Sequence, residues 1–302
     1  MYGLKTILAL IAVMAAAATV AAQRGPIQIG VVDLGNNVYQ LTGGSNAVLA
    51  VGTDGAILVD SKFREPEALV RKVAEVTAQP VRVVINTHSH PDHVGANEPF
   101  RRQGANVLST ARAAAWMARP FLAPNGNMDP PLAEGGRPNQ TFTGRRTVTV
   151  GSQRAEAIEV TADAHSSGDA YVHFPAANVI VMGDLHHSNE YPVYDADMGC
   201  LCGSYEENLK AYDAMLALGN DQTKYIPGHR AVTTKAEVTA YVAMLRATRT
   251  RVQRLIDQGR TAEDVVALKL LADDKSPNSP GPDNRDSFIR VLYDALKTGK
   301  GR

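Results

Sequence analysis

Apolar and polar positions alternate over short stretches in the region that follows residue 30. A glycine pair and an Asp-Gly pair interrupt the apolar runs, as is typical of strands joined by tight turns. The pattern predicts strands at residues 38–41, 47–51 and 56–60. From Pro66 onwards apolar residues recur every three or four positions, which predicts a helix. Residues 81–85 form another, mainly apolar run and predict a buried strand.

Strands and helices continue in a similar order through the rest of the chain. Further strands are predicted at residues 105–108, 147–150, 155–160, 170–174 and 179–182. Helices are predicted at residues 111–117, 206–218, 236–258, 262–271 and 287–296. Periodicity therefore predicts a mixed α and β protein. We interpret its two blocks, residues 27–118 and 141–232, as halves of one domain.

Residues 119–140 have no periodic pattern and contain five prolines, three glycines and three asparagines. A loop of this length inside a compact domain is usually functional or disordered. Phe121, Leu122 and Met128 give the segment apolar side chains. We interpret it as a flap over the functional site, with an unstructured insertion as the alternative. Residues 273–284, rich in Pro, Ser and Asp, predict a linker before the last helix.

The densest group of metal-ligating residue types follows a predicted buried strand. His88, His90, Asp92 and His93 lie within six residues, and the whole chain has eight histidines. Imidazole and carboxylate groups suit zinc and similar divalent ions. An extended backbone directs His88 and His90 to one side, because they are two positions apart. Pro91 bends the chain before Asp92 and His93. The spacing therefore predicts a metal site with two ions.

These residues form an H-x-H-x-D-H signature, in which the chain resembles the metallo-β-lactamase superfamily. The resemblance implies an α/β fold of four layers, an αββα sandwich with the metals at the edge where the two sheets meet. It also implies later ligands in the motifs H-S-S-G-D, G-D and P-G-H. The implied ligands are His88, His90 and His165 for the first ion, Asp92, His93 and His229 for the second, and Asp184 as the bridge.

Other residues beside these motifs have separate predicted roles. Asp169, which closes the H-S-S-G-D motif, is expected to fix its loop rather than bind metal. His186, His187 and Tyr191 are candidate substrate contacts beside the implied bridge. The two adjacent histidines have further interpretations, as an extra metal ligand or as exposed loop residues. His173 is interpreted as a histidine of the core or the surface.

The resemblance implies a dinuclear zinc hydrolase, and the amino-terminal segment described below predicts that it is exported. In it a metal-bound hydroxide attacks the carbonyl of an ester, thioester, lactone or related compound, and Asp92 orients or shuttles the proton. Hydrolysis of β-lactam antibiotics is an alternative, although the antibiotic-degrading members generally have Cys or Ser where this chain has Asp184. An iron-dependent sulfur dioxygenase needs only some of these ligands, so iron stays open as the metal. A non-catalytic metal-binding protein is the last alternative.

The first 22 residues predict export. They combine one charge, Lys5, with an apolar run that ends in Val20-Ala21-Ala22, which is typical of a cleaved secretory signal. A retained membrane anchor is the alternative. After cleavage, residues 23–302 would form a single domain in the periplasm or outside the cell, without stable membrane insertion. The helices from about residue 234 to residue 302 would belong to that domain.

Charge argues against a nucleic-acid partner, and cysteine content argues against a fold held by disulfides. Removal of Lys5 from 31 basic residues leaves 30 against 31 acidic residues, and no basic stripe for nucleic acid is evident. A small-molecule substrate is therefore expected, and the oligomeric state stays open. Cys200 and Cys202 are too close for an easy disulfide, so the fold is not expected to depend on one. We interpret them as structural cysteines, with a metal-capture pair as the alternative.

Overall fold

The computed structural model describes residues 28–62, 66–122, 127–188, 190–192, 203–272 and 283–298. The predicted signal segment, Cys200, Cys202 and most of the predicted linker lie outside these residues. Among the helices that are described, none combines the length and the apolar character needed to cross a bilayer.

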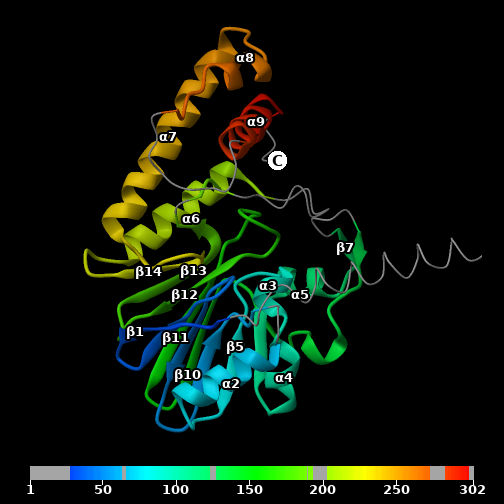
Figure 1. The fold of residues 1–302 in the computed structure, drawn as a ribbon, viewed down its shortest axis with the longest axis vertical. Coiled ribbons are helices and arrows are strands. Elements are labelled where there is room, and N and C mark those ends of the chain that lie inside the picture. The colour runs from blue at the N-terminus through cyan, green and yellow to red at the C-terminus, as the bar shows by residue number, and fades with distance from the viewer. Residues whose placement is uncertain are drawn as a thin grey trace, which may run out of the picture.

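The amino-terminal half of the described chain forms a seven-stranded sheet (Figure 1). Its strands, in spatial order, are β1 (Val31–Gly35), β2 (Val38–Leu41), β3 (Ala47–Val51), β4 (Ala56–Val59), β5 (Val81–Ile85), β6 (Asn106–Thr110) and β9 (Gln140–Phe142). The first four strands pair antiparallel through short turns. From β4 onwards the pairs are parallel, because longer connections return the chain to the starting edge.

Helices and short elements make these parallel connections. Between β4 and β5 lies α2 (Pro66–Val76). Between β5 and β6 lie α3 (Pro91–Val94) and α4 (Asn97–Arg102). The connection from β6 to β9 contains α5 (Ala111–Met117), β7 (Phe121–Leu122), β8 (Met128–Asp129) and the 3₁₀ turn η1 (Glu134–Gly136). The loops that follow β4 and β5 therefore open at the same edge of the sheet.

The second half repeats this plan in a six-stranded sheet. Its strands, in spatial order, are β10 (Arg145–Val150), β11 (Gln153–Glu159), β12 (Ala170–Phe174), β13 (Val179–His187), β14 (Lys224–His229) and β15 (Thr233–Thr234). The strands from β10 to β13 pair antiparallel, and α6 (Tyr205–Leu218) then connects β13 to its parallel neighbour β14. The two predicted blocks are thus the two sheets, although β9 extends the first block beyond residue 118.

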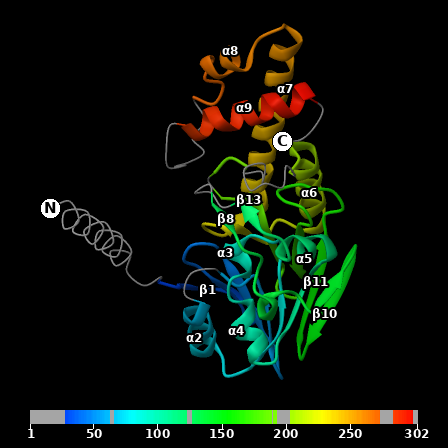
Figure 2. The same ribbon diagram turned by 90° about the vertical axis from the view of Figure 1, so that its right-hand side faces the viewer.

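Alternation of side chains along the strands creates the layers. In β3 and β4, Val48, Ile57 and Val59 face the second sheet and pack in a core between the two sheets. Leu49 and Leu58 point the other way, into a core beneath α2 and α4. A third core joins the outer face of the second sheet to α6 and the helices after it. The predicted αββα sandwich is confirmed, with its sheets between helical layers (Figures 1 and 2).

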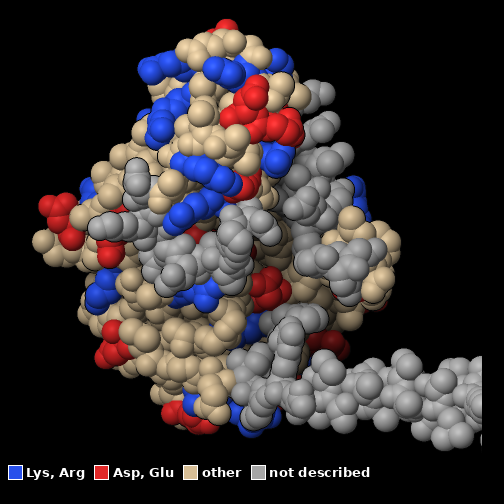
Figure 3. Space-filling view, turned by 45° about the horizontal axis from the view of Figure 1, so that its top comes forward, with Lys and Arg blue, Asp and Glu red and all other residues tan. Residues whose placement is uncertain are grey.

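In the described part of the chain, three helices follow the second sheet. These are α7 (Lys235–Asp257), α8 (Ala262–Ala267) and α9 (Asp283–Thr298). A capping box between Thr234 and Glu237 starts α7, which satisfies backbone N–H groups at its first turn. Helix α7 extends away from the sandwich towards α8, and α9 lies across α7 (Figures 1 and 2). Basic and acidic side chains are interspersed over this region (Figure 3). Ion pairs such as Arg246 with Asp213 link α7 to α6.

The structure differs from several predicted elements. The segment 119–140 was expected to lack regular structure, but β7 and β8 pair within it. Two-residue strands carry too little pattern to be recognised, and pairing partners alone define them. Strand β13 runs five residues beyond the predicted end at 182, whereas α8 ends four residues before the predicted end at 271. The short elements β1, α3 and α4 were not predicted.

Candidate metal centre

The H-x-H-x-D-H motif lies at the carboxyl end of β5. His88 and His90 occupy the loop after the strand, and their ring centroids are 4.5 Å apart. Pro91 then begins α3, because its fixed φ suits a first helical position. The helical turn directs His93 to a different position from that of His88, as the spacing predicts. One short segment thereby supplies ligands to two neighbouring positions.

His165 comes from the loop between β11 and β12. The buried carboxylate of Asp169 accepts hydrogen bonds from the backbone N–H of His165 at 2.9 Å and from that of Ser166 at 2.9 Å. It also accepts a hydrogen bond from the Ser166 hydroxyl at 2.6 Å. Burial raises the pKa of Asp169 to about 6, although these hydrogen bonds oppose the rise. The structure thus gives Asp169 the loop-fixing contacts that were expected.

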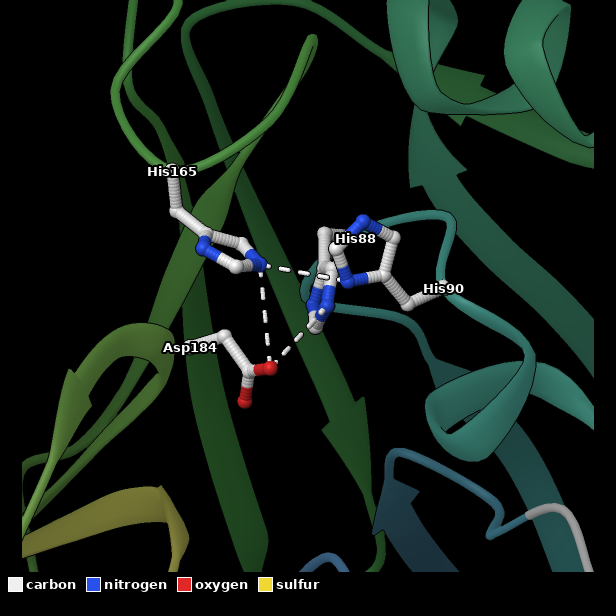
Figure 4. A group of neighbouring side chains, drawn as sticks. All are labelled: His88, His90, His165 and Asp184. Carbon is white, nitrogen blue, oxygen red and sulfur yellow. Dashed lines mark hydrogen bonds and ion pairs between the residues drawn. The ribbon is translucent and has the colours of Figure 1, made fainter. Parts of the chain in front are cut away.

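The first group of candidate ligands contains His88, His90, His165 and Asp184 (Figure 4). One ligand atom from each lies within 4.8 Å of all the others. Nε2 of His165 is 3.2 Å from Nδ1 of His90 and 3.6 Å from Oδ2 of Asp184. Nε2 of His88 is 3.7 Å from the same carboxylate oxygen. These atoms converge on one point, as the ligands of a metal ion do.

The second group contains Asp92, His93 and His229. Nε2 of His229 is 3.1 Å from Oδ2 of Asp92. Asp184 contacts this group as well, because its Oδ1 lies 3.1 Å from Nε2 of His93. The carboxylate of Asp184 therefore stands between the two groups, because its Oδ2 contacts the first group and also lies 3.5 Å from Nε2 of His229. The structure brings all seven predicted ligands into a single cluster.

Gly228 allows Asp184 to reach this position. A Cβ atom at residue 228 would lie 1.8 Å from Oδ1 of Asp184 and 2.8 Å from the carbonyl carbon of Gly183. Strands β13 and β14 approach here with no room for a side chain. Glycine at residue 228 is therefore needed for close approach rather than for an unusual backbone angle.

His187 joins the cluster as a candidate ligand of the second position. Its Nε2 is 3.2 Å from Oδ2 of Asp184, and it groups with Asp184 and His229. The interpretation of His187 as an exposed loop residue is wrong, because it is buried at the end of β13. Residues three apart in a regular strand face opposite sides. Here the pairing register shifts between Gly183 and His187, so both side chains reach the site.

Carboxylates behind the histidines orient their rings. Nδ1 of His93 lies 2.8 Å from Oδ2 of Asp60, and Nδ1 of His187 lies 3.2 Å from Oε2 of Glu190. Asp60 also accepts a hydrogen bond from the Thr87 backbone N–H at 2.7 Å. A carboxylate on Nδ1 directs the lone pair of Nε2 towards a metal. Neither carboxylate was predicted, and only the position of Asp60 at a strand end beside β5 hinted at its role.

Four further hydrogen bonds hold this assembly. The carbonyl oxygen of Glu190 accepts a hydrogen bond from the Tyr241 hydroxyl of α7 at 2.9 Å. Buried Lys62 donates to the carbonyls of Gly43 and Ser45, and the Ser45 hydroxyl donates to the carbonyl of Asp92 at 2.5 Å. Burial lowers the pKa of Lys62 to about 8, although Asp92 and Asp60 oppose the shift. Lys62 thus anchors the loop that supports the second ligand group.

The donor atoms fit a bound metal. Nε2 of His88, His93 and His187 and Oδ1 of Asp184 are buried and make no hydrogen bond to the described part of the chain. Buried polar atoms without partners are unfavourable and rare. Divalent cations coordinated by these nitrogen and oxygen atoms would satisfy all four. A set of imidazole and carboxylate donors suits zinc or iron, so the residues fit both of the metals considered above.

Charges within the cluster shift the pKa values of its carboxylates and imidazoles, which favours cation binding. Burial raises the pKa of Asp184, but His93 and His187 outweigh this effect and hold the pKa well below its usual range. Burial lowers the pKa of His187, but Asp184 and Glu190 outweigh it and raise the pKa to about 9. For His88, burial and the neighbouring His93 both lower the pKa. The metal-free cluster thus keeps ionised carboxylates beside protonated and neutral imidazoles.

Metal binding should therefore release protons. His187 is protonated below about pH 9 in the metal-free protein, and a metal ligand must be neutral. Apparent metal affinity should rise as the pH increases towards 9. The paired charge of His187 should stabilise the metal-free fold fully below pH 6.5, and this stabilisation should be lost as the pH rises through 9.

Titration calorimetry in buffers of different ionisation enthalpy would count the released protons. His187→Gln should release fewer protons than the wild type. His173→Gln is a matched control, because His173 lies on β12 beside Glu156 rather than in the cluster. Metal binding without proton release at pH 7 would contradict the assignment of His187 as a ligand.

The structure places His186 and Tyr191 away from the cluster. His186 is buried, with its Nδ1 2.9 Å from the Tyr212 hydroxyl. Tyr191 is also buried, and its ring stacks on Phe288 with centroids 5.1 Å apart. These positions do not agree with the prediction that His186 and Tyr191 contact the substrate. They pack in the core beneath the C-terminal helices, because the irregular end of β13 turns His187, and not His186, to the site.

Solved structures with similar folds include two enzymes of different named activity. One is a metallo-beta-lactamase from Pontibacter korlensis, with 20% identity and a TM-score of 0.60, covering 72% of this chain and 99% of that one. The other is the stereoselective inverting sec-alkylsulfatase Pisa1 from Pseudomonas sp., with 17% identity and a TM-score of 0.62. That match covers 88% of this chain and 50% of the sulfatase. At these identities the likeness shows the fold.

Sequence comparison adds one relative and a family. The 2,4-dinitroanisole O-demethylase subunit alpha of Nocardioides sp. (strain JS1661) is 26% identical over 197 residues, which are 64% of this chain. The match spans 55% of the length of that relative. The family model of the metallo-beta-lactamase superfamily matches residues 41–229, a range that contains both ligand groups. The chain therefore belongs to the metallo-beta-lactamase superfamily.

Proposed function

We propose that this protein is a dinuclear zinc hydrolase that cleaves an ester, a thioester or a lactone. The observation that carries the proposal is the position of Asp184, whose carboxylate contacts both ligand groups. Its Oδ1 lies 3.1 Å from Nε2 of His93 in the second group, and its Oδ2 lies 3.6 Å from Nε2 of His165 in the first group. A shared carboxylate is suited to two adjacent cations. When bound, such cations lower the pKa of a water molecule and polarise a carbonyl oxygen.

Asp92 is the residue best placed to handle the proton of the attacking water. Its side chain is 39% exposed, whereas that of Asp184 is 5% exposed. Burial raises the pKa of Asp92, but His93 and His229 outweigh this and hold the carboxylate ionised. An ionised carboxylate at the open side can accept a proton from water as the water oxygen attacks the carbonyl carbon. The proton then passes to the departing alcohol, thiol or ring oxygen.

A substrate panel tests the proposal. Zinc-loaded protein should hydrolyse chromogenic esters, thioesters or lactones, and a chelator should abolish the turnover. Asp92→Asn should lower kcat by about 100-fold, in the range expected for loss of general base catalysis. Asp213→Asn provides a matched control, because Asp213 is an exposed residue of α6 paired with Arg246.

The panel should also contain a β-lactam, a secondary alkyl sulfate and 2,4-dinitroanisole. These compounds correspond to activities named for proteins that this chain resembles. Preferred turnover of one of them would replace the ester, thioester and lactone classes as the substrate. Turnover that requires iron and consumes oxygen would overturn the zinc hydrolase and favour a dioxygenase.

A further inference from the structure

A cavity of about 540 Å³ lies directly behind the metal loop. Small-molecule pockets usually have volumes of roughly 300–1,000 Å³, so the cavity can hold a substantial organic group. Its wall combines α3, α5 and residues 129–133, which belong to the segment predicted as a flap. The apolar side chains that line it include Val94, Trp116, Met117, Phe121, Pro131 and Leu132.

His90 belongs to both the cavity and the candidate metal centre. The residue lines the cavity, while its Nδ1 faces the cluster at 3.2 Å from Nε2 of His165. Ser89 and Pro91, on either side of it, also line the cavity. A molecule whose reactive group lies at the cluster could therefore extend a second group past His90 into the cavity. The cavity thus adjoins the candidate metal centre at His90.

The cavity wall is held in place by local contacts. The backbone N–H of Leu132 donates to the carbonyl of Met117 at 2.9 Å, which joins the flap segment to α5. Leu132 also packs against the small core of Val94, Ala113 and Met117. The guanidinium carbon of Arg119 lies 5.3 Å from the centre of the Trp116 ring. These contacts fix an apolar wall and place charged groups at its margin.

We propose that this cavity binds the apolar group of the substrate, an alkyl chain or an aryl ring attached to the cleaved ester. The proposal rests on the hydrolase function argued above. An apolar occupant follows from the lining, because its aliphatic, aromatic and proline side chains outnumber its polar ones, which are Ser89, His90, Glu98, Arg119 and Asp129. Each buried methylene group should increase kcat/KM by about fourfold until the cavity is filled.

Binding can be tested without turnover. Trp116 is the only tryptophan in the sequence, so the intrinsic tryptophan fluorescence of the protein reports on this cavity. Titration of the zinc-loaded protein with 1-octanol should change the emission and saturate, whereas methanol at the same concentrations should not. Saturable quenching or a blue shift would support the proposal. An emission that does not respond to 1-octanol would overturn it.

Turnover gives an independent test. In a series of p-nitrophenyl esters from acetate to hexanoate, the wild type should show the rise with chain length and Ala133→Phe should show less than twofold change per methylene. Ala133 is an exposed residue that lines the cavity, so this substitution fills space without removing core contacts. Ala115→Phe is a matched control, because Ala115 is exposed on α5 and does not line the cavity.

The two tests separate failure of this proposal from failure of the proposed function. Octanol binding without cleavage of any ester, thioester or lactone would leave the cavity assignment intact and reject the hydrolase function. Ester cleavage that does not depend on chain length, or that changes equally in both variants, would reject the cavity assignment and leave the hydrolase function intact.

Discussion

Asp184→Asn should reduce turnover by at least about 100-fold, the largest effect expected for any conservative substitution in the chain. Asparagine keeps the shape of the side chain but removes the negative charge that both ligand groups share. The second cation should be lost first, because His93 and His187 would then face each other without a carboxylate between them. Any remaining activity should shift to higher pH, because the activated water would retain its proton more strongly.

Metal analysis after dialysis, together with a pH profile of kcat, would measure both effects. The wild type should retain about two cations per chain and the variant about one or fewer. Asp213→Asn again serves as the control for loss of one carboxylate from an exposed site. If Asp184→Asn keeps two tightly held metals and near wild-type turnover, Asp184 is not the shared ligand.

Gly228→Ala adds a single methyl group and should remove metal binding almost as completely as Asp184→Asn does. The added Cβ would occupy the position of Oδ1 of Asp184, at 1.8 Å, and would press against the backbone of Gly183. Either the carboxylate leaves its place between the ligand groups or β13 and β14 separate. Overpacking of this kind costs about 1–3 kcal/mol of unfolding free energy. The metal site should therefore fail while much of the fold survives.

Circular dichroism and metal analysis would separate these effects. Gly136→Ala is a suitable control, because the atom nearest to a Cβ there is Cγ of Leu132, at an ordinary contact distance of 3.4 Å. The control should keep its metal content. A Gly228→Ala protein that binds two cations with wild-type affinity would show that Asp184 does not need the position seen here.

The local part of the site was predictable from sequence because its ligands are neighbours along the chain. His88, His90, Asp92 and His93 fall within one loop and one helical turn, so spacing alone places them together. His165, Asp184 and His229 come from distant segments, and only the family resemblance indicated that they would meet. The four-layer fold likewise followed from the resemblance, whereas periodicity gave the strands and helices.

The orientation of His187 and the role of Asp60 were not predicted, because they arise from an irregular strand and from strand pairing. Two-residue periodicity from Asp184 would turn His186 to the site and His187 away, but the irregular stretch after Gly183 reverses that outcome. Gly183 has a φ of +56°, and the local sequence does not predict that this glycine adopts a left-handed conformation within the strand. Asp60 reaches His93 only because β4 and β5 are parallel neighbours. Strand pairing is a long-range property, so these partners become visible only in the structure.

The hydrogen bond from Tyr241 to Glu190 connects α7 to the metal site, because Glu190 also orients the imidazole of His187. Local opening of that helix would release the Glu190 carbonyl and loosen the carboxylate that orients the imidazole. The helix and this corner of the site should consequently exchange amide hydrogens as one cooperative unit. Residue 234 is thus a poor place for truncation or domain fusion, even though the family match ends at residue 229. A truncated or fused version of this protein should therefore retain α7 together with the metal ligands.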